Sequence, residues 1–298
     1  MNEPQTRARA ALDELLRQLD LAGAPRELVE TQCLPIARVI NERAKQRVFA
    51  GISGAQGTGK TTVAALVHVL LCEGFGLRSL VVSLDDFYLP RAARQALAHD
   101  VHPLLATRGV PGTHDVEALH AALRQLRAGQ PAELFQFSKA HDDRLPEMRV
   151  VRGPFDVVLF EGWCVGARAC ADAELRKPIN ALERDEDRGA RFRRYVNTQL
   201  AQPYAALWAE LDLLIYIAAP DLSAVHAFRS QQERRLRLSA AAGARGLMED
   251  SQLARFIQHF ERISERMLRE TPSHADVVVR IDAERRTLAL EVAPVRPS

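Results

Sequence analysis

Short apolar runs alternate with amphipathic stretches along most of the chain. Six runs have the composition of β-strands: VFAGIS (48–53), SLVVSL (79–84), DVVLF (156–160), LLIYIA (213–218), VVVRI (277–281) and TLALEV (287–292). Between them, stretches such as TTVAALVHVLLCEGFG and VEALHAALRQLRAG repeat apolar residues at helical spacing. This alternation is typical of an α/β fold with a parallel sheet covered on both faces. The last two runs, joined by DAERR, predict an antiparallel hairpin at one edge.

The first 46 residues have a different pattern. Residues 6–46 show helical periodicity that is interrupted by Gly23-Ala24-Pro25, which predicts two helices. The sequence contains no internal repeat, low-complexity tract or flexible linker. We therefore expect an N-terminal helical extension (1–46) followed by one main domain (47–298).

Composition narrows the choice of partners and compartment. The 298 residues are 47% apolar and carry a formal charge of +2, so nothing points to nucleic acid or a membrane surface as a partner. The four cysteines show no C-x-x-C spacing, the start MNEPQTRARA lacks the apolar core of a signal peptide, and no apolar stretch approaches the ~20 residues that span a bilayer. We expect a cytoplasmic protein with reduced thiols.

The strongest chemical motif is GAQGTGKTT, which directly follows the first predicted strand and directly precedes a predicted helix. It matches G-x-x-x-x-G-K-[ST], a loop whose backbone N–H groups surround phosphates. In this pattern Lys60 would reach the β- and γ-phosphates of ATP, and the Thr61 hydroxyl would hold Mg²⁺. The predicted nucleotide contacts are Gly54, Ala55, Gln56, Gly57, Thr58, Gly59, Lys60, Thr61 and Thr62.

A second element of a nucleotide site is an acid at the end of another apolar strand. In FDVVLFEGW, Glu161 follows Phe160 and precedes Gly162, which allows close approach of the backbone. We interpret Glu161 as a ligand of Mg²⁺ or of a Mg²⁺-bound water, although an ordinary strand-terminal glutamate is the alternative.

The remaining motifs favour phosphoryl transfer to a small acceptor, since the N-K-x-D tetrapeptide of guanine-nucleotide switches and an L-S-G-G-Q-like transporter signature are both absent. The stretch SLDDFYLP ends a strand beside the phosphate loop. If strand alternation continues, Asp85 lies on one face and Asp86 and Tyr88 lie on the other, so only one aspartate can face the γ-phosphate. A turn or helix-capping pair is the alternative.

Two further segments contain polar groups suited to an acceptor and a lid. Residues 102–146 are polar and irregular, and loops on a rigid sheet concentrate binding groups: Arg108, His114, Asp115, Lys139, Asp142, Asp143 and Arg144. Only four of the 40 basic residues are lysine, and Lys139 is one of them, so an anionic acceptor would suit it. A basic helix with Arg229, Arg234, Arg235, Arg237 and Arg245 could close over the triphosphate. Structural or solvated roles are the alternatives for both segments.

From about residue 50 to the end, the chain resembles the phosphoribulokinase, uridine kinase and pantothenate kinase group of P-loop kinases, and most of all its D-glycerate 3-kinase-like members. The resemblance rests on GISGAQGTGKTT, SLDDFYLP, TRGVPGTHD, FSKAHDDRLP, FEGWCVG, YVNTQLAQPYAALW and HAFRSQQERRLR. It implies a three-layer α/β sandwich of the P-loop nucleoside triphosphate hydrolase fold, with a lid around residues 226–247.

The resemblance also implies roles for single residues. The D-x-F pattern of the group selects Asp85 over Asp86 as the aspartate that activates the acceptor, with Lys60 and Thr61 binding ATP and Mg²⁺ and Glu161 on the metal side. The lid would contain Arg229, Arg234 and Arg237, and the acceptor site Asp86, Tyr88, Arg108, His114, Asp115, Lys139 and Arg144.

The expected activity is therefore ATP- and Mg²⁺-dependent phosphorylation of a small, anionic hydroxy acid, D-glycerate first among candidates. Ser138 replaces an aspartate that relatives tend to have, which leaves the acceptor open. A kinase of the same group acting on a nucleoside or pantothenate-like acceptor, and a regulatory nucleotide-binding protein with weak ATPase activity, are the alternatives.

Overall fold

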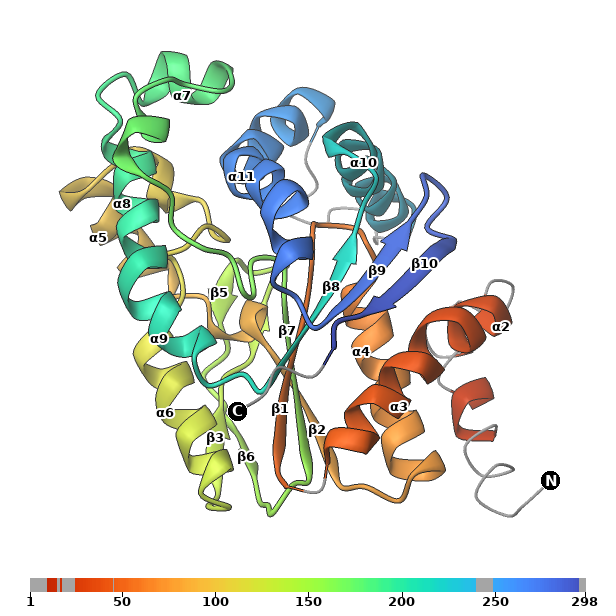
Figure 1. The fold of residues 1–298 in the computed structure, drawn as a ribbon. Coiled ribbons are helices and arrows are strands. Elements are labelled where there is room, and N and C mark those ends of the chain that lie inside the picture. Colours follow the sequence, from red (N-terminus) through yellow and green to blue (C-terminus); the bar gives the residue numbers. More distant parts are fainter. Residues whose placement is uncertain (1–9, 15–16, 18–24, 45, 240–248, 295–298) are drawn as a thin grey trace.

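The structure, a computed structural model, describes residues 10–14, 17, 25–44, 46–239 and 249–294. Its centre is a six-stranded sheet in the order β10-β9-β8-β1-β7-β2 (Figure 1). The strands are β1 (Val48–Gly54), β2 (Ser79–Ser83), β7 (Val157–Gly162), β8 (Leu213–Ala218), β9 (Val277–Ile281) and β10 (Thr287–Val292). All neighbours are parallel except β9 and β10, which form the edge hairpin. The α/β fold with a mainly parallel sheet is thus confirmed.

Helices cover the sheet on both sides. They are α2 (Pro25–Leu28), α3 (Leu34–Arg43), α4 (Lys60–Val69), α5 (Arg91–Asp100), α6 (Val116–Arg127), α7 (Ala181–Glu186), α8 (Arg191–Gln199), α9 (Ala205–Trp208), α10 (Leu222–Ser239) and α11 (Asp250–Glu270). A π-helical turn (Val29–Cys33) joins α2 to α3, and another (Leu200–Tyr204) joins α8 to α9. No helix within the described ranges is long and apolar enough to cross a membrane.

Alternation along the central strand β1 produces two separate apolar cores. Phe49 belongs to the core beneath α6, α8, α9 and α11, whereas Ala50 and Ile52 belong to the core beneath α3, α4 and α10. Full burial of one such aliphatic or aromatic side chain stabilises the fold by about 1.5–3 kcal/mol. The result is the three-layer arrangement visible in Figure 1, with the sheet between two layers of helices.

The carboxyl ends of three parallel strands meet at one edge of the sheet. Gly54 ends β1, and in the β2–β7 register Ser83 lies opposite Glu161. Ligands of open parallel sheets bind at this edge, so the phosphate loop, Glu161 and the turn after β2 share one location.

The polar segment 102–146 is more ordered than the sequence predicts. It contains the 3₁₀ turn Pro103–Ala106 and helix α6, the strand β3 (Ala132–Leu134) that pairs with β6 (Arg149–Val151), and the two-residue pair β4 (Phe137–Ser138) and β5 (Asp143–Arg144). The last pair places Ser138 opposite Asp143 beside the turn after β2.

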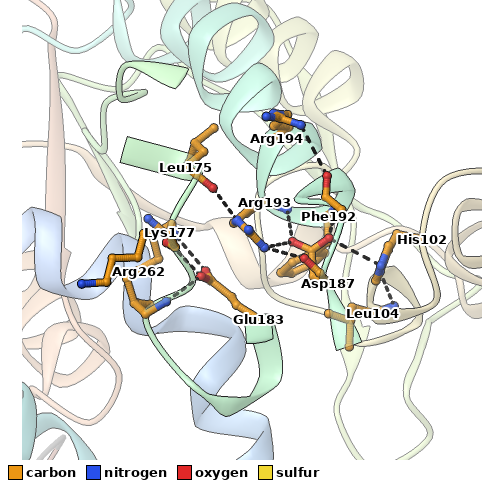
Figure 2. A network of polar contacts seen from close by, with 12 residues as sticks. His102, Leu104, Leu175, Lys177, Glu183, Asp187, Phe192, Arg193, Arg194 and Arg262 are labelled. Atoms are coloured by element: carbon orange, nitrogen blue, oxygen red, sulfur yellow. Dashed lines mark hydrogen bonds and ion pairs between the residues drawn. The ribbon is translucent and has the colours of Figure 1, made fainter. Parts of the chain in front are cut away.

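A buried ionic network stabilises the region between α7 and α8 (Figure 2). Asp187 is fully buried and accepts hydrogen bonds from the backbone of Phe192 and from Arg193, whose guanidinium lies 2.8 Å from it and also donates to the Leu175 carbonyl at 2.6 Å. His102, at the start of the acceptor-side segment, lies 3.6 Å from the same carboxylate. The network therefore links α8 to the segment that precedes Arg108.

Candidate active site

The phosphate loop has the backbone geometry that the motif requires. Gly57 and Gly59 have φ values of +80° and +90°, and helix α4 begins directly afterwards at Lys60. A Cβ atom on Gly57 would lie 2.7 Å from the Cβ of Phe228, so glycine is needed there for space as well as for conformation. The first N–H groups of α4 have no helical acceptor and are available to an anion. The nine residues predicted to contact the nucleotide, 54–62, form this continuous loop and first helical turn.

Glu161 lies beside the phosphate loop, and its carboxylate has capacity left for a cation. The Thr61 hydroxyl donates to Glu161 Oε1 at 3.2 Å, and Ser83 Oγ donates to the same oxygen at 2.7 Å. Oε2 is buried and has no hydrogen-bond partner among the described residues. Hydroxyl and carboxylate oxygens are the hard ligands that Mg²⁺ prefers, and a buried carboxylate oxygen without a hydrogen-bond partner is available to bind a cation. The residues therefore fit Mg²⁺.

The described residues contain no group of three or more His, Cys, Asp or Glu side chains arranged around a possible metal position. This agrees with Mg²⁺ sites of phosphoryl-transfer enzymes, where one or two protein ligands suffice because phosphates and waters complete the shell. Ser83 was not predicted as part of this site.

SLDDFYLP does not continue as a strand. Strand β2 ends at Ser83, whose Oγ accepts the backbone N–H of Asp85 at 3.3 Å, and Leu84–Phe87 form a 3₁₀ turn. The prediction that strand alternation separates Asp85 from Tyr88 was therefore wrong. The Tyr88 hydroxyl donates to Asp85 Oδ1 at 2.8 Å, so the two side chains meet on the same side.

Asp85 is surrounded by cations. Burial by itself would raise the pKa of this carboxyl group, but the ammonium groups of Lys139 and Lys60 and the hydrogen bonds from Lys139 and Tyr88 lower the pKa well below its usual range. Lys139 Nζ donates to Asp85 Oδ2 at 2.7 Å, and the Lys139 side chain is 61% exposed. An ion pair with such an exposed partner contributes little to stability.

Asp86 has different surroundings. Its Oδ1 accepts the backbone N–H of Phe137 at 3.4 Å, a contact that joins the turn to β4. Burial raises the pKa of Asp86, and the neighbouring charges of Asp85 and Glu161 act in the same direction. Asp86 thus supports the acceptor loops, in contrast to the cation-bound Asp85.

Arg108 lies in a cluster of two guanidinium groups and one carboxylate. Arg108 and Arg94 both pair with Asp142, the Arg94 contact being 3.0 Å long, and the Arg108 guanidinium lies 5.5 Å from the centre of the Phe137 ring. Arg94 is only 1% exposed and also donates to the carbonyls of Leu89, Ala106 and Asp142. Two cations share the Asp142 carboxylate, and Asp143 adds a second negative charge within the field of Arg94.

Asp115 and Arg144 are bonded to each other. Asp115 begins α6 by accepting the N–H of Ala118 at 3.1 Å, and Arg144 lies 3.2 Å from the same carboxylate. Arg144 also stacks on Phe135 and donates to the carbonyl of Tyr88. Both residues therefore hold the turn after β2 in place.

His114 is buried below the turn after β2. Its ring stacks on Tyr88 at 4.7 Å between centroids, Nδ1 is hydrogen-bonded to the hydroxyl of Tyr204, and Nε2 is buried without a partner in the described part of the chain. Tyr204 was not predicted as a site residue.

The predicted lid is only partly described. Arg229, on α10, pairs with Glu233 at 3.0 Å and lies over the Phe256 ring of α11. Burial lowers the pKa of Arg229, Glu233 opposes this shift, and the charge of Arg108 adds to it, so Arg229, in the middle of α10, lies within the electrostatic reach of Arg108. Arg234 is exposed. The Arg237 and Arg235 side chains, and Arg245, lie outside the described residues.

A cavity of about 440 Å³ adjoins the phosphate loop, and part of its lining comes from segments outside the predicted phosphate loop and lid. Besides residues 57–63, its lining comes from the N-terminal helix (Glu27, Leu28, Thr31, Gln32), from α10 (Gln231, Gln232) and from the β9–β10 turn (284–287). Arg285 in that turn donates to the carbonyl of Gly57 at 2.7 Å. The N-terminal and C-terminal parts of the chain thus meet at the phosphate loop.

Several known proteins resemble this chain in sequence or in fold. No protein-family model matches the chain. An uncharacterized kinase, mug58, of Schizosaccharomyces pombe is 31% identical over 70% of this chain and 77% of its own length. The chloroplastic D-glycerate 3-kinase of Arabidopsis thaliana is 29% identical over 79% of this chain, which spans about half (52%) of the plant protein.

Among solved structures, the D-glycerate 3-kinase of Cryptococcus neoformans var. grubii superposes with a TM-score of 0.72 at 26% identity. The superposition covers 87% of this chain and 97% of the fungal chain. The likeness therefore extends over most of both chains.

Proposed function

Because the chain belongs to the P-loop kinases that include D-glycerate 3-kinases, uridine kinases and pantothenate kinases, and is an ATP-dependent kinase, we propose that its acceptor is a small anionic hydroxy acid, D-glycerate being the first candidate. The γ-phosphate would pass to a hydroxyl group of that acid. The finding that carries the proposal is the position of Asp85, at the sheet edge beside the phosphate loop and within the field of both Lys60 and Lys139.

The donor side of the reaction follows from the loop geometry. Lys60 and the N-terminus of α4 would bind the β- and γ-phosphates, and the nucleoside would lie in the adjoining cavity. Mg²⁺, held by Thr61 and Glu161, would neutralise charge on the phosphate oxygens. Ser83 keeps the Glu161 carboxylate oriented through its 2.7 Å hydrogen bond.

Asp85 would bind the acceptor hydroxyl and hold it in line with the γ-phosphate. Its lowered pKa keeps the carboxylate ionised, so it accepts the hydroxyl hydrogen bond at any pH at which the protein works. Phosphoryl transfer through a loose transition state requires positioning and charge stabilisation more than a strong base. An ionised, hydrogen-bonded aspartate suits that requirement.

The acceptor loops favour an anion. Arg108 and Arg94 share the single carboxylate of Asp142, and Lys139 can turn from Asp85 towards an entering carboxylate. Ser138, where relatives tend to have aspartate, is bonded to His141 and adds no negative charge. Since planar guanidinium groups bind carboxylates in a bidentate manner, Arg108 is the expected contact for the acid group.

The proposal is tested by measuring ADP release from MgATP with no acceptor and with D-glycerate, uridine or pantothenate. We expect D-glycerate to stimulate release, with phosphoglycerate formed in equal amount. Arg108→Met should raise the KM for D-glycerate and leave the KM for ATP unchanged. Arg124→Met, on the exposed face of α6, is the matched control.

Other results of this assay would indicate a different acceptor or a different function. Stimulation of ADP release by uridine or pantothenate but not by D-glycerate would show that the acceptor is one that another kinase of this group uses. Slow ADP release that no acceptor increases would instead support a regulatory nucleotide-binding protein.

A further inference from the structure

The segment YVNTQLAQPYAALW (195–208) runs from the middle of α8 to the end of α9 and has no part in the mechanism above. It lies directly against residues 109–114, which we call the acceptor loop. Gly112 in that loop has a φ of +96°, and a Cβ there would lie 2.5 Å from a ring carbon of Tyr195 and 2.9 Å from Gln199. The segment includes the π-helical turn Leu200–Tyr204, with Pro203 inside it. Such turns occur frequently at functional sites.

The hydroxyl of Tyr204 joins two points of the acceptor loop. It accepts the backbone N–H of Gly112 at 3.0 Å and is hydrogen-bonded to Nδ1 of His114. Tyr204 is fully buried, and the backbone N–H of His114 is a further hydrogen-bond donor to its hydroxyl. Because the oxygen already accepts from Gly112, the phenolic proton has one acceptor, His114 Nδ1.

This bond determines where His114 carries its own proton. Burial lowers the pKa of His114 to about 4, with Asp85 opposing the shift, so the ring is neutral at physiological pH. A neutral imidazole has one N–H group, and a ring nitrogen that accepts a hydrogen bond is the unprotonated one. The proton of His114 therefore lies on Nε2.

The Nε2–H group has no acceptor in the described part of the chain and is buried. Leaving a buried donor unpaired costs free energy, and such groups need a partner that the free protein lacks. The His114 ring stacks on Tyr88, and Tyr88 donates to Asp85. A partner of Nε2 would thus lie close to the hydroxyl that Asp85 holds.

Resting on the proposed kinase function, we propose that Tyr204 is a positioning residue that fixes His114 as the Nε2–H tautomer, and that His114 then donates a hydrogen bond to an oxygen of the acceptor. The partner must present a lone pair, as a carboxylate or hydroxyl oxygen does. An acceptor with an ammonium or amide N–H at this position would place two donors against each other and bind poorly.

Tyr204→Phe removes one hydroxyl and keeps the buried ring. We expect long-range ¹H–¹⁵N spectra to show the Nε2–H form of His114 in the wild type and loss of that form in the variant. The KM for the acceptor should rise about tenfold or more, the loss expected for one hydrogen bond to a charged partner, with the KM for ATP unchanged. Tyr195→Phe is the matched control, since its hydroxyl makes no hydrogen bond to any described residue and its ring contact with Gly112 is kept.

A second pair of variants covers the case in which Tyr204→Phe does not fold. His114→Gln keeps an N–H donor and should retain a lower acceptor KM than His114→Phe. A protonated or Nδ1–H imidazole in the wild type, an unchanged acceptor KM after loss of the Nε2–H form, or equal KM values for the Gln and Phe variants would each overturn the inference. A wild-type protein that uses no acceptor would refute the proposed function instead, while the tautomer measured by NMR still decides the role of Tyr204.

Discussion

Two adjacent aspartates with the same side chain have opposite surroundings in this structure. Asp85 is bonded by Tyr88 and Lys139, and their donors lower its pKa, whereas burial and neighbouring carboxylates raise the pKa of Asp86. Cations beside the phosphate loop therefore favour the ionised form of Asp85, whereas the surroundings of Asp86 oppose its ionised form. The D-x-F pattern selects Asp85, but the difference in charge and burial around the two carboxyl groups comes from neighbours in space such as Lys139 and Glu161.

Asp85→Asn keeps the shape of the side chain and removes its charge. We expect kcat to fall by at least about a hundredfold, because losing one transition-state contact commonly costs about 3–4 kcal/mol. Asp86→Asn should have a smaller effect, since the hydrogen bond that Asp86 makes within the described part of the chain is to the backbone N–H of Phe137. Steady-state kinetics give kcat, and titration with a fluorescent ATP analogue checks that nucleotide binding persists. Equal losses of kcat at the two positions would contradict the assignment.

The sequence identifies candidate site residues that belong to one local motif or end a strand. Lys60, Thr61 and the glycines around them follow from a nine-residue pattern, and Glu161 follows from its place at a strand end. It did not predict Ser83, Arg94 or Tyr204, whose partners are distant in the sequence. Arg94, for example, meets Asp142 across 48 positions, and no periodicity links the two.

At the scale of elements, the strands were predicted within one or two residues, but the turn after β2 was not. The apolar run continues through Leu84, so alternation seemed to continue as well. Ser83 ends the strand because its hydroxyl accepts the N–H of Asp85, and residues three apart in a 3₁₀ turn eclipse one another. That local hydrogen bond brings Asp85 and Tyr88 together.

The connection between α7 and α8 depends on one buried ion pair. Arg193 and Asp187 are 3% and 0% exposed, so Arg193→Met leaves an uncompensated buried charge and should lower the free energy of unfolding by about 3–5 kcal/mol. Arg194 is 48% exposed and pairs with Asp172, so Arg194→Met should change the free energy of unfolding by less than about 1 kcal/mol. Urea titrations of both variants provide the comparison. A smaller loss for Arg193→Met than for Arg194→Met would show that the network in Figure 2 does not stabilise the connection.

At the scale of the molecule, the N-terminal segment is part of the main core. Cys33, Ile36, Ala37 and Ile40 are fully buried in the same apolar core as α4. We propose that residues 25–44 extend the kinase domain and do not fold as a separate unit. Sequence periodicity predicted the helices, but it could not show which face of the sheet they cover, because both faces of the sheet are apolar.

Ile36→Ala tests this packing. Truncation of a fully buried isoleucine should lower the free energy of unfolding by about 2–5 kcal/mol, whereas Glu42→Ala on the exposed face of α3 should change it by no more than about 0.5 kcal/mol. Both variants should unfold in a single transition when followed by far-ultraviolet circular dichroism. An independent early transition in Ile36→Ala would show that the helices form a unit of their own.

The contact of Arg285 with the Gly57 carbonyl affects how the chain folds during its synthesis. The cavity beside the phosphate loop takes its lining from Glu27 at one extreme and Thr287 at the other, and Thr31 and Thr287 are joined by a 3.0 Å hydrogen bond. A ribosome-bound chain has its phosphate loop early but acquires this wall of the cavity only when the β9–β10 turn emerges. The complete cavity is therefore not present to bind ATP until the β9–β10 turn has emerged and packed against the phosphate loop.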